Sequence, residues 1–193
     1  MVLLKMRGSI CWHPINAIWI YQVHSLTSAK RGGEAVGYQG RKSAVTSNSL
    51  YLSDNKGQML AVGTPQSGQH NDLYNIESIF KEMLEILEQA GISSKGIFLK
   101  ADPGFDSEEM RTLCEQNEIE LNVKPNKRNG KQETIEYKYF DAKLYKNRTK
   151  IEHANAWLVA FKTLLVRYVK RIFTWTGLNW LAFITRFSLK LKV

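Results

Sequence analysis

The chain has 193 residues, of which 44% are hydrophobic and 23% are charged, and a formal net charge of +9. This composition argues against a disordered chain and predicts one folded domain with a core. The charge is uneven, because residues 73–123 carry four basic and eleven acidic side chains, whereas residues 124–193 carry sixteen basic and four acidic ones. A basic segment of this size suits a polyanion, with nucleic acid first and a membrane surface second.

The N-terminal part has no acidic residue before Glu34, and only residues 15–23 predict a strand. Residues 30–42, KRGGEAVGYQGRK, predict a basic, glycine-rich loop, which is either a flexible connector or a backbone that approaches phosphates. Cys11 and Cys114 have no nearby second thiol and no zinc-type histidine spacing. Both are predicted to be reduced and structural, as in a cytoplasmic protein.

A β-hairpin is predicted over residues 47–63, with Asp54 as a turn residue rather than a catalyst. Asp72 is expected to cap the next helix, which closes at Gly91. His70 is either a satisfied loop residue or a functional group. One face of that helix is acidic, and the other carries apolar residues at a period of 3.6: Ile76, Ile79, Phe80, Met83, Leu84 and Leu87.

A buried strand is predicted at residues 97–99, and Asp102 lies at its end because proline and glycine follow. Asp106 is expected to cap the next helix, with Glu109 completing a capping box. A strand at 121–123, the basic loop KPNKRNGK and C-terminal helices follow. The last of these, residues 172–189, is predicted to be a buried helix with a basic tail rather than a membrane span.

This order of elements predicts an α/β fold, in which a mixed sheet has an antiparallel hairpin half and a parallel half, flanked by helices. In the segment YKNRTKIEHANAW, the spacing places Tyr145, Arg148 and Glu152 on one side of a helix. Taken alone, Arg148 and Glu152 fit an exposed ion pair worth about 0.3–0.5 kcal/mol. Taken alone, Asp102 fits a turn-capping aspartate.

Several stretches in order, GYQGRK, SGQHNDLYNIE, ADPGFDS, KPNKRNGK and YKNRTKIEHANAW, together resemble the DDE transposases of bacterial insertion sequences. The resemblance implies a ribonuclease-H-like fold that cuts the ends of an element and joins them to target DNA, using a two-ion Mg²⁺ or Mn²⁺ site. It implies that Asp102 and Glu152 are catalytic, metal-binding acids meeting at a shared cation. His70, Tyr145 and Arg148 are the implied secondary residues. The residues expected to bind DNA are Arg41, Lys42, Lys124, Lys127, Arg128 and Lys131.

The same resemblance exposes a defect, because the first catalytic aspartate of the family falls at Val23 or Tyr21, depending on the alignment. Residues 1–29 are therefore interpreted as a degenerate or non-homologous segment. Residues 30–193 are interpreted as the catalytic domain of a truncated copy, with a basic loop near 124–140. Two acids should hold paired metals poorly, so the lone chain is expected to be inactive.

The predicted function is an impaired transposase catalytic domain. The alternatives are a non-catalytic DNA-binding remnant and a nuclease of the same fold. The expected partner is double-stranded DNA, both element ends and target, with no membrane. The expected location is the cytoplasm, near the nucleoid. Joining two ends suggests that the ancestor worked as a homo-oligomer.

Overall fold

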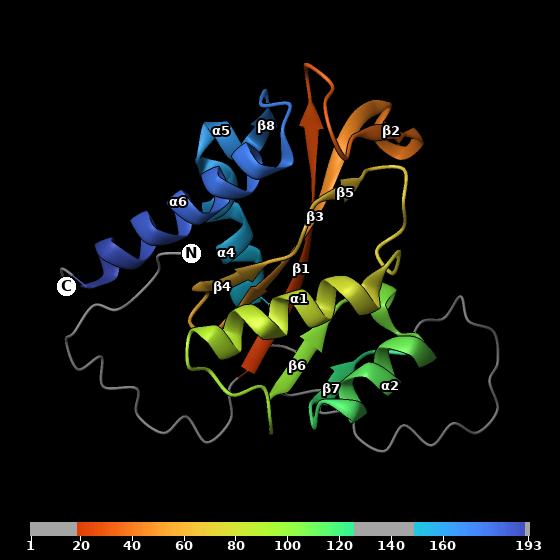
Figure 1. The fold of residues 1–193 in the computed structure, drawn as a ribbon, viewed down its shortest axis with the longest axis vertical. Helices are drawn as coiled ribbons and strands as arrows, with labels where there is room; N and C mark the ends of the chain where they lie inside the picture. Colours follow the sequence, from red (N-terminus) through yellow and green to blue (C-terminus); the bar gives the residue numbers. More distant parts are fainter. Residues whose placement is uncertain (1–18, 126–148, 192–193) are drawn as a thin grey trace.

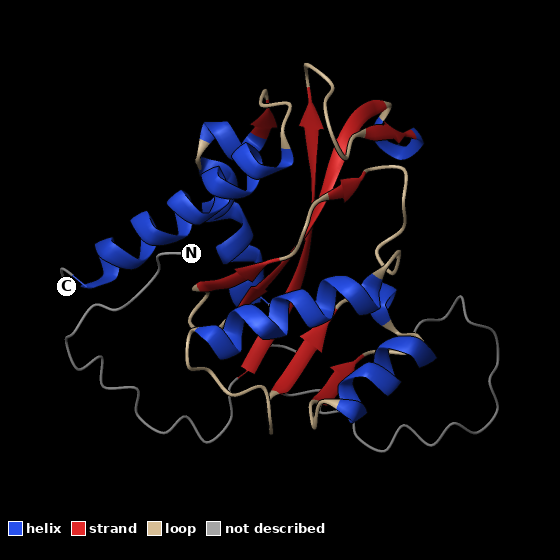
Figure 2. Ribbon diagram, viewed as in Figure 1, coloured by secondary structure: helices blue, strands red, loops and turns tan. Residues whose placement is uncertain are grey.

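The computed structural model describes residues 19–125 and 149–191, which form one mixed sheet with helices on both faces (Figure 1, Figure 2). The strands are β1 (Trp19–Ala29), β2 (Gly37–Gln39), β3 (Ala44–Ser53), β4 (Met59–Val62), β5 (Gln66–Ser67), β6 (Phe98–Ala101), β7 (Glu120–Val123) and β8 (Val166–Arg167). The helices are α1 (Ile76–Gln89), α2 (Glu108–Gln116), α4 (Thr149–Ala160), α5 (Lys162–Leu165) and α6 (Ile172–Leu191), with 3₁₀ turns at Gly40–Lys42 and Pro103–Phe105.

The sheet has the order β2-β3-β1-β6-β7, and β1 lies at its centre. On one side of β1, the strands β2 to β5 pair antiparallel, around β3. On the other side, β6 and β7 run parallel to β1, and β8 joins the end of β1 in parallel. The predicted mixed sheet with an antiparallel half and a parallel half is therefore confirmed.

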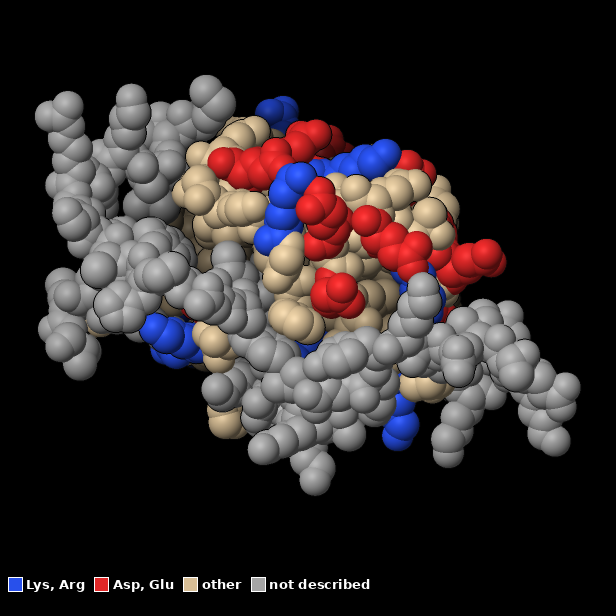
Figure 3. Space-filling model, turned by 90° about the horizontal axis from the view of Figure 1, so that it is seen from below, with Lys and Arg blue, Asp and Glu red and all other residues tan. Residues whose placement is uncertain are grey.

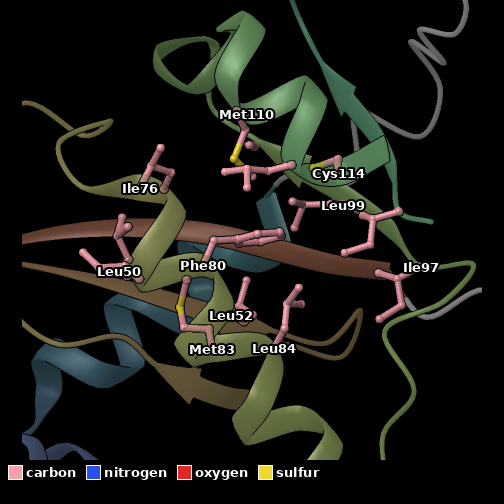
Figure 4. Packing of buried hydrophobic residues seen from close by; sticks show 14 of the residues in the cluster. Leu50, Leu52, Ile76, Phe80, Met83, Leu84, Ile97, Leu99, Met110 and Cys114 are labelled. Atoms are coloured by element: carbon pink, nitrogen blue, oxygen red, sulfur yellow. The ribbon is translucent and has the colours of Figure 1, made fainter. Parts of the chain in front are cut away.

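Alternate residues of β3 supply the two halves of the core. Leu50 and Leu52 belong to the cluster under α1 and α2, whereas Tyr51 between them belongs to the cluster under α4, α5 and α6. This alternation is the period-two pattern of a strand covered on both faces. Figure 4 shows the first cluster, in which Phe80 and Met83 of α1 pack near the strands.

The predicted hairpin is present as β3 and β4, and Asp54 is its turn residue. One oxygen of Asp54, Oδ1, accepts hydrogen bonds from the backbone N–H of Lys56 at 2.9 Å and of Gln58 at 2.7 Å. Gly57 adopts the left-handed conformation that this turn requires, with φ of 71°. The carboxylate of Asp54 therefore holds the turn, as expected from its local sequence.

The predicted α1 helix is confirmed, together with its buried face. It ends in a Schellman motif, in which the N–H of Gly91 donates to the carbonyl of Glu88 and the N–H of Ile92 donates to that of Leu87, both at 2.9 Å. Gly91 has φ of 77°, which explains the glycine at this position. The six predicted core positions are all buried, namely Ile76, Ile79, Phe80, Met83, Leu84 and Leu87.

Asp72 does not cap α1, so that prediction is wrong. The N-cap residue is Asn75, which has φ of 52° and makes no side-chain capping bond. The intervening residues form a turn of their own, in which the N–H of Tyr74 donates to the carbonyl of Asn71 at 3.2 Å. This turn separates Asp72 from the first helical residue.

Asp106 does not cap α2 either, and the predicted capping box with Glu109 does not form around it. The N-cap is Ser107, whose Oγ accepts from the N–H of Met110 at 3.1 Å. Asp106 is buried and forms an ion pair with Arg111, with 2.5 Å between Oδ1 and Nη2. The carboxylate of Asp106, which the local sequence predicts to cap α2, therefore binds the guanidinium of Arg111 instead.

Two boundaries in the first part of the chain differ from the prediction. The first strand runs from residue 19 to residue 29, past the expected end at residue 23, because β3 and β6 pair with it on both sides. Residues 15–18 lie outside the described residues. The predicted loop at residues 30–42 contains β2 and a 3₁₀ turn, so its second half is ordered by pairing with β3.

The last helix, α6, is buried on one side only, which corrects the expectation of a buried helix. Trp175, Asn179 and Ala182 are buried against the sheet, whereas Phe173 is 87% exposed. None of the helices in residues 19–125 and 149–191 combines the length and the hydropathy that a membrane span requires.

Cys114 is a free, buried thiol on α2, as predicted, and Cys11 lies outside the described residues. Burial raises the pKa of Cys114 to about 12. Near pH 8 only about one thiol in 10⁴ is then ionised, so we expect iodoacetamide to label Cys114 far more slowly in the native chain than in urea. Peptide mass spectrometry measures both rates. Equal labelling rates would contradict the burial of the Cys114 side chain.

Candidate functional site

Asp102 lies directly after β6, at the strand end that the sequence predicted. Pro103 begins a 3₁₀ turn there, and the N–H of Phe105 donates to the carbonyl of Asp102 at 2.9 Å. Phe105 is fully buried, which anchors the turn in the core. The Asp102 side chain is half-buried, at the edge of the sheet where ligands bind in α/β folds.

The pairing of β1 with β6 identifies the position beside Asp102. Trp19 pairs with Phe98 and Tyr21 pairs with Lys100. Continuing this parallel register by two residues brings Val23, not Tyr21, to the level of Asp102. On the other side of β1, Val23 pairs with Tyr51. Of the two positions that the sequence left open for the first acid, the register selects Val23.

Glu152 lies in the first turn of α4, and its side chain is exposed. This helix packs against β1, with Ala154 and Leu158 buried in the same cluster as Tyr51. Glu152 and Asp102 therefore come from the helix on one face of β1 and from the strand beside it. That the two carboxylates share a cation stays a prediction.

The carboxylates of Asp102 and Glu152 alone do not fit a two-ion metal site, which three acids would hold. Asp102 and Glu152 would supply two of the ligands, but Val23 stands at the register position beside Asp102 and offers no oxygen. Among residues 19–125 and 149–191, no group of three or more histidine, cysteine, aspartate or glutamate side chains is arranged to hold a metal ion.

The loop that carries His70 and Asp72 adjoins the turn after Asp102. Oδ2 of Asp72 lies 3.4 Å from the place that a Cβ on Gly104 would occupy. The ring of His70 stacks on Tyr74, with 3.6 Å between the centroids and 9° between the planes. The functional role predicted for His70 stays a prediction.

A cavity of about 290 Å³ lies beside this stack. It is lined by β5 with the loop before it, by the loop between β5 and α1, and by the first turns of α1, including Gln66, His70, Tyr74 and Glu82. Sequence reasoning did not identify the stack. The four-residue spacing of two rings just before a helix was the signal that could have indicated it.

The three predicted DNA-binding residues that lie in the described part of the chain do not form one cluster. Arg41 and Lys42 are exposed in the turn after β2, at one edge of the sheet, and Lys124 is exposed after β7, at the opposite edge. The other members of that set, Lys127, Arg128 and Lys131, lie outside the described residues, as do Tyr145 and Arg148. The helix face expected to unite Tyr145, Arg148 and Glu152 stays a prediction.

The family model described as DDE superfamily endonuclease matches residues 23–176 of the chain. The structure is similar to that of piggyBac transposase in a synaptic complex with hairpin DNA, with a TM-score of 0.54 and 11% identity, over 87% of this chain and 45% of that one. At this identity the likeness shows the fold alone, in agreement with the ribonuclease-H-like fold that the resemblance implied.

Two further structures are similar at lower scores. The catalytic core domain of BIV integrase has a TM-score of 0.44 and 10% identity, over 88% of this chain and 82% of that one. The catalytic domain of Mos1 mariner transposase has a TM-score of 0.42 and 8% identity, over 76% and 82%. A comparison with curated proteins gives no match. The chain spans less than half the length of the piggyBac transposase.

Proposed function

Because the chain belongs to the DDE superfamily endonuclease family, we propose that it is an insertion-sequence transposase catalytic domain whose strand cleavage and strand transfer are impaired. The observation that carries the proposal is the register of β1 against β6, which, continued by two residues past Tyr21 and Lys100, brings a valine to the level of Asp102. Asp102 and Glu152 are the two remaining acids of the proposed site. The acid expected at position 23 is missing.

The chemistry explains why one missing acid matters. Phosphodiester cleavage needs an activated water or 3′-hydroxyl and a stabilised leaving oxygen, and divalent ions supply both in this type of reaction. Asp102 at a strand end and Glu152 on α4 offer carboxylate oxygens, which magnesium prefers. Val23 offers none, so the chain lacks one of the three carboxylates that would hold the divalent ions.

We expect the purified chain to show no Mg²⁺- or Mn²⁺-dependent nicking above that of the Asp102→Ala, Glu152→Ala double variant. The measurement is conversion of supercoiled plasmid to the nicked form. Circular dichroism of both proteins controls for folding. Robust metal-dependent nicking that disappears in the double variant would overturn the proposed impairment.

A second candidate function, a non-catalytic DNA-binding remnant, is favoured by the same valine together with the exposed cations Arg41, Lys42 and Lys124. Joining of a 3′ end to target DNA separates a transposase from a nuclease of the same fold. Absence of nicking and joining in the parent chain fits both readings, so the Val23→Asp variant separates them. Restored nicking identifies an impaired catalytic domain, whereas retained DNA binding without restored nicking identifies the remnant. If the chain is a transposase domain, we also expect it to lie near the nucleoid and to assemble into a homo-oligomer.

A further inference from the structure

Two loops that are far apart in the sequence are fastened together at the end of the sheet where β1 and β8 finish, at the top of Figure 1. The N–H of Lys30 donates to the carbonyl of Arg167 at 3.0 Å, and the N–H of Glu34 donates to that of Lys170 at 2.9 Å. A Cβ on Gly33 would lie only 2.6 Å from Cα of Lys170, so the two backbones touch. We call residues 30–34 and 167–171 the clasp.

Arg167 fixes the clasp from inside. Its side chain is fully buried, and it donates from Nε to the carbonyl of Val169 and from Nη2 to that of Lys170, both at 2.9 Å. Nη1 donates to Oγ of Ser47 on β3 at 2.9 Å, and the guanidinium lies 5.7 Å from the ring centroid of Trp175. The clasp is therefore a rigid part of the sheet rather than a loose pair of loops.

Glu34 is the acidic side chain of the clasp, and its carboxylate is engaged with the backbone. Oε2 of Glu34 accepts a hydrogen bond from the N–H of Ile172, the first residue of α6, at 2.8 Å. The carboxylate thus stabilises the positive end of the α6 dipole. It does not form an ion pair with the exposed lysines and arginines around it in the described structure.

Four exposed cations lie on the outside of the clasp, two on each loop: Lys30, Arg31, Lys170 and Arg171. None of them forms an ion pair with a carboxylate in the described part of the chain. The cations beside α1 and α2 behave differently, because Lys81 pairs with Glu77 at 2.7 Å and Lys95 pairs with Glu118 at 2.5 Å. Figure 3, which views the molecule from below relative to Figure 1, shows acidic side chains gathered on this face, with basic ones among them.

Holding four like charges together costs free energy through mutual repulsion, which a polyanion relieves. The clasp has no structural need for these charges, since its backbone bonds, Arg167 and Glu34 already hold it. Lysine and arginine side chains on a rigid, exposed surface are typical contacts to DNA phosphates. Arg41 and Lys42 are not part of the clasp, because they lie in the turn that follows β2 at the edge of the sheet.

We propose that the clasp binds the sugar-phosphate backbone of duplex DNA, independently of sequence, through Lys30, Arg31, Lys170 and Arg171. This inference rests on the proposed function and adds a contact surface to it. Along the direction of β1 the clasp begins seven residues after Val23, which corresponds to about 23 Å of strand. A duplex lying along this side would therefore contact the clasp well away from Asp102.

The test compares two variants that lose the same number of charges. The clasp variant is Arg31→Gln, Lys170→Gln, Arg171→Gln, and the matched control is Lys56→Gln, Lys81→Gln, Lys95→Gln, all at exposed positions. Fluorescence anisotropy of a labelled duplex of arbitrary sequence is measured over a range of salt. For the clasp variant we expect at least a tenfold higher Kd at low salt. Its slope of log K against log salt should be smaller by about two to three.

The control variant should keep the parent slope and a Kd within about twofold of the parent value, unless net charge alone determines binding. Equal losses in the two variants would overturn the clasp proposal and leave the proposed function standing. A parent chain that does not bind the duplex at low salt overturns both. The two failures are therefore distinguishable.

A second pair of variants tests the geometry without changing charge. Gly33→Ala places a Cβ 2.5 Å from the carbonyl oxygen of Lys170, at a φ of 125°, whereas Gly32→Ala meets nothing within 4 Å. We expect Gly33→Ala to weaken DNA binding at least about threefold more than Gly32→Ala, because phosphate contacts need the cations in fixed positions. Equal affinity of two folded variants would show that the arrangement of the clasp does not matter.

Discussion

Replacing Val23 by aspartate should give the chain Mg²⁺- or Mn²⁺-dependent DNA nicking activity, about 10²–10³ times the background rate of the Asp102→Ala, Glu152→Ala double variant. This factor is typical of adding one electrostatic group to a transition state of high charge. Plasmid nicking under the conditions used for the parent chain measures the gain. The predicted effect is large because cleavage by this type of site depends on ions that several acids hold together.

The substitution site follows from strand pairing. Tyr21 pairs with Lys100, so residue 23 comes level with Asp102 in the same parallel register. The pairing of Val23 with Tyr51 puts this position opposite a residue of the cluster that α4 covers, and α4 carries Glu152. An aspartate at position 23 would thus be flanked by the elements that bear the other two acids.

Three control variants separate a restored site from other effects of a polar residue in β1. Val23→Asn introduces a side chain of nearly the same shape as aspartate but without its charge, and this variant should remain inactive. Tyr21→Asp places the acid two residues earlier, about 6–7 Å along the strand, and should also remain inactive. Adding Asp102→Ala to Val23→Asp should abolish the gain. Activity from Tyr21→Asp, or none from a folded Val23→Asp that binds Mn²⁺, would contradict the proposed site.

The parts of the fold that local sequence determines could be predicted. The period of 3.6 in α1 and its closing Gly91 depend on neighbouring residues, as does the Asp54 turn. The two helix caps were mispredicted although the competing interactions are local, because a capping pattern does not show which of several nearby groups a carboxylate will bind. Asp106 pairs with Arg111 instead, and a separate turn separates Asp72 from α1.

The candidate site depends on contacts between distant segments, and sequence reasoning reached it only in part. The motif order predicted Asp102 and Glu152, but the choice between Val23 and Tyr21 required the register of β1 with a strand about eighty residues later. The clasp joins residues more than 130 positions apart through backbone bonds, which no side-chain pattern reports. Pairing partners of this kind are fixed by the whole sheet, not by local propensity.

Removing the buried guanidinium of Arg167 should lower the free energy of unfolding by about 2–4 kcal/mol, because the carbonyls of Val169 and Lys170 each lose a hydrogen-bond donor. Burial lowers the pKa of Arg167 from its ordinary value, and the charge of Glu34 opposes this shift. Arg167→Met keeps much of the volume but leaves the carbonyls of Val169 and Lys170 without their donor. Urea denaturation followed by circular dichroism measures the change.

Two further variants show whether the hydrogen bonds or the charge account for the loss. Arg167→Lys keeps a cation, but an ammonium cannot reproduce the planar fork that reaches Ser47, Val169 and Lys170 together, so most of the loss should remain. Arg171→Met removes an exposed cation of the same clasp and should change stability by less than about 0.5 kcal/mol. An Arg167→Met protein as stable as Arg171→Met would show that the guanidinium does not hold the two loops together.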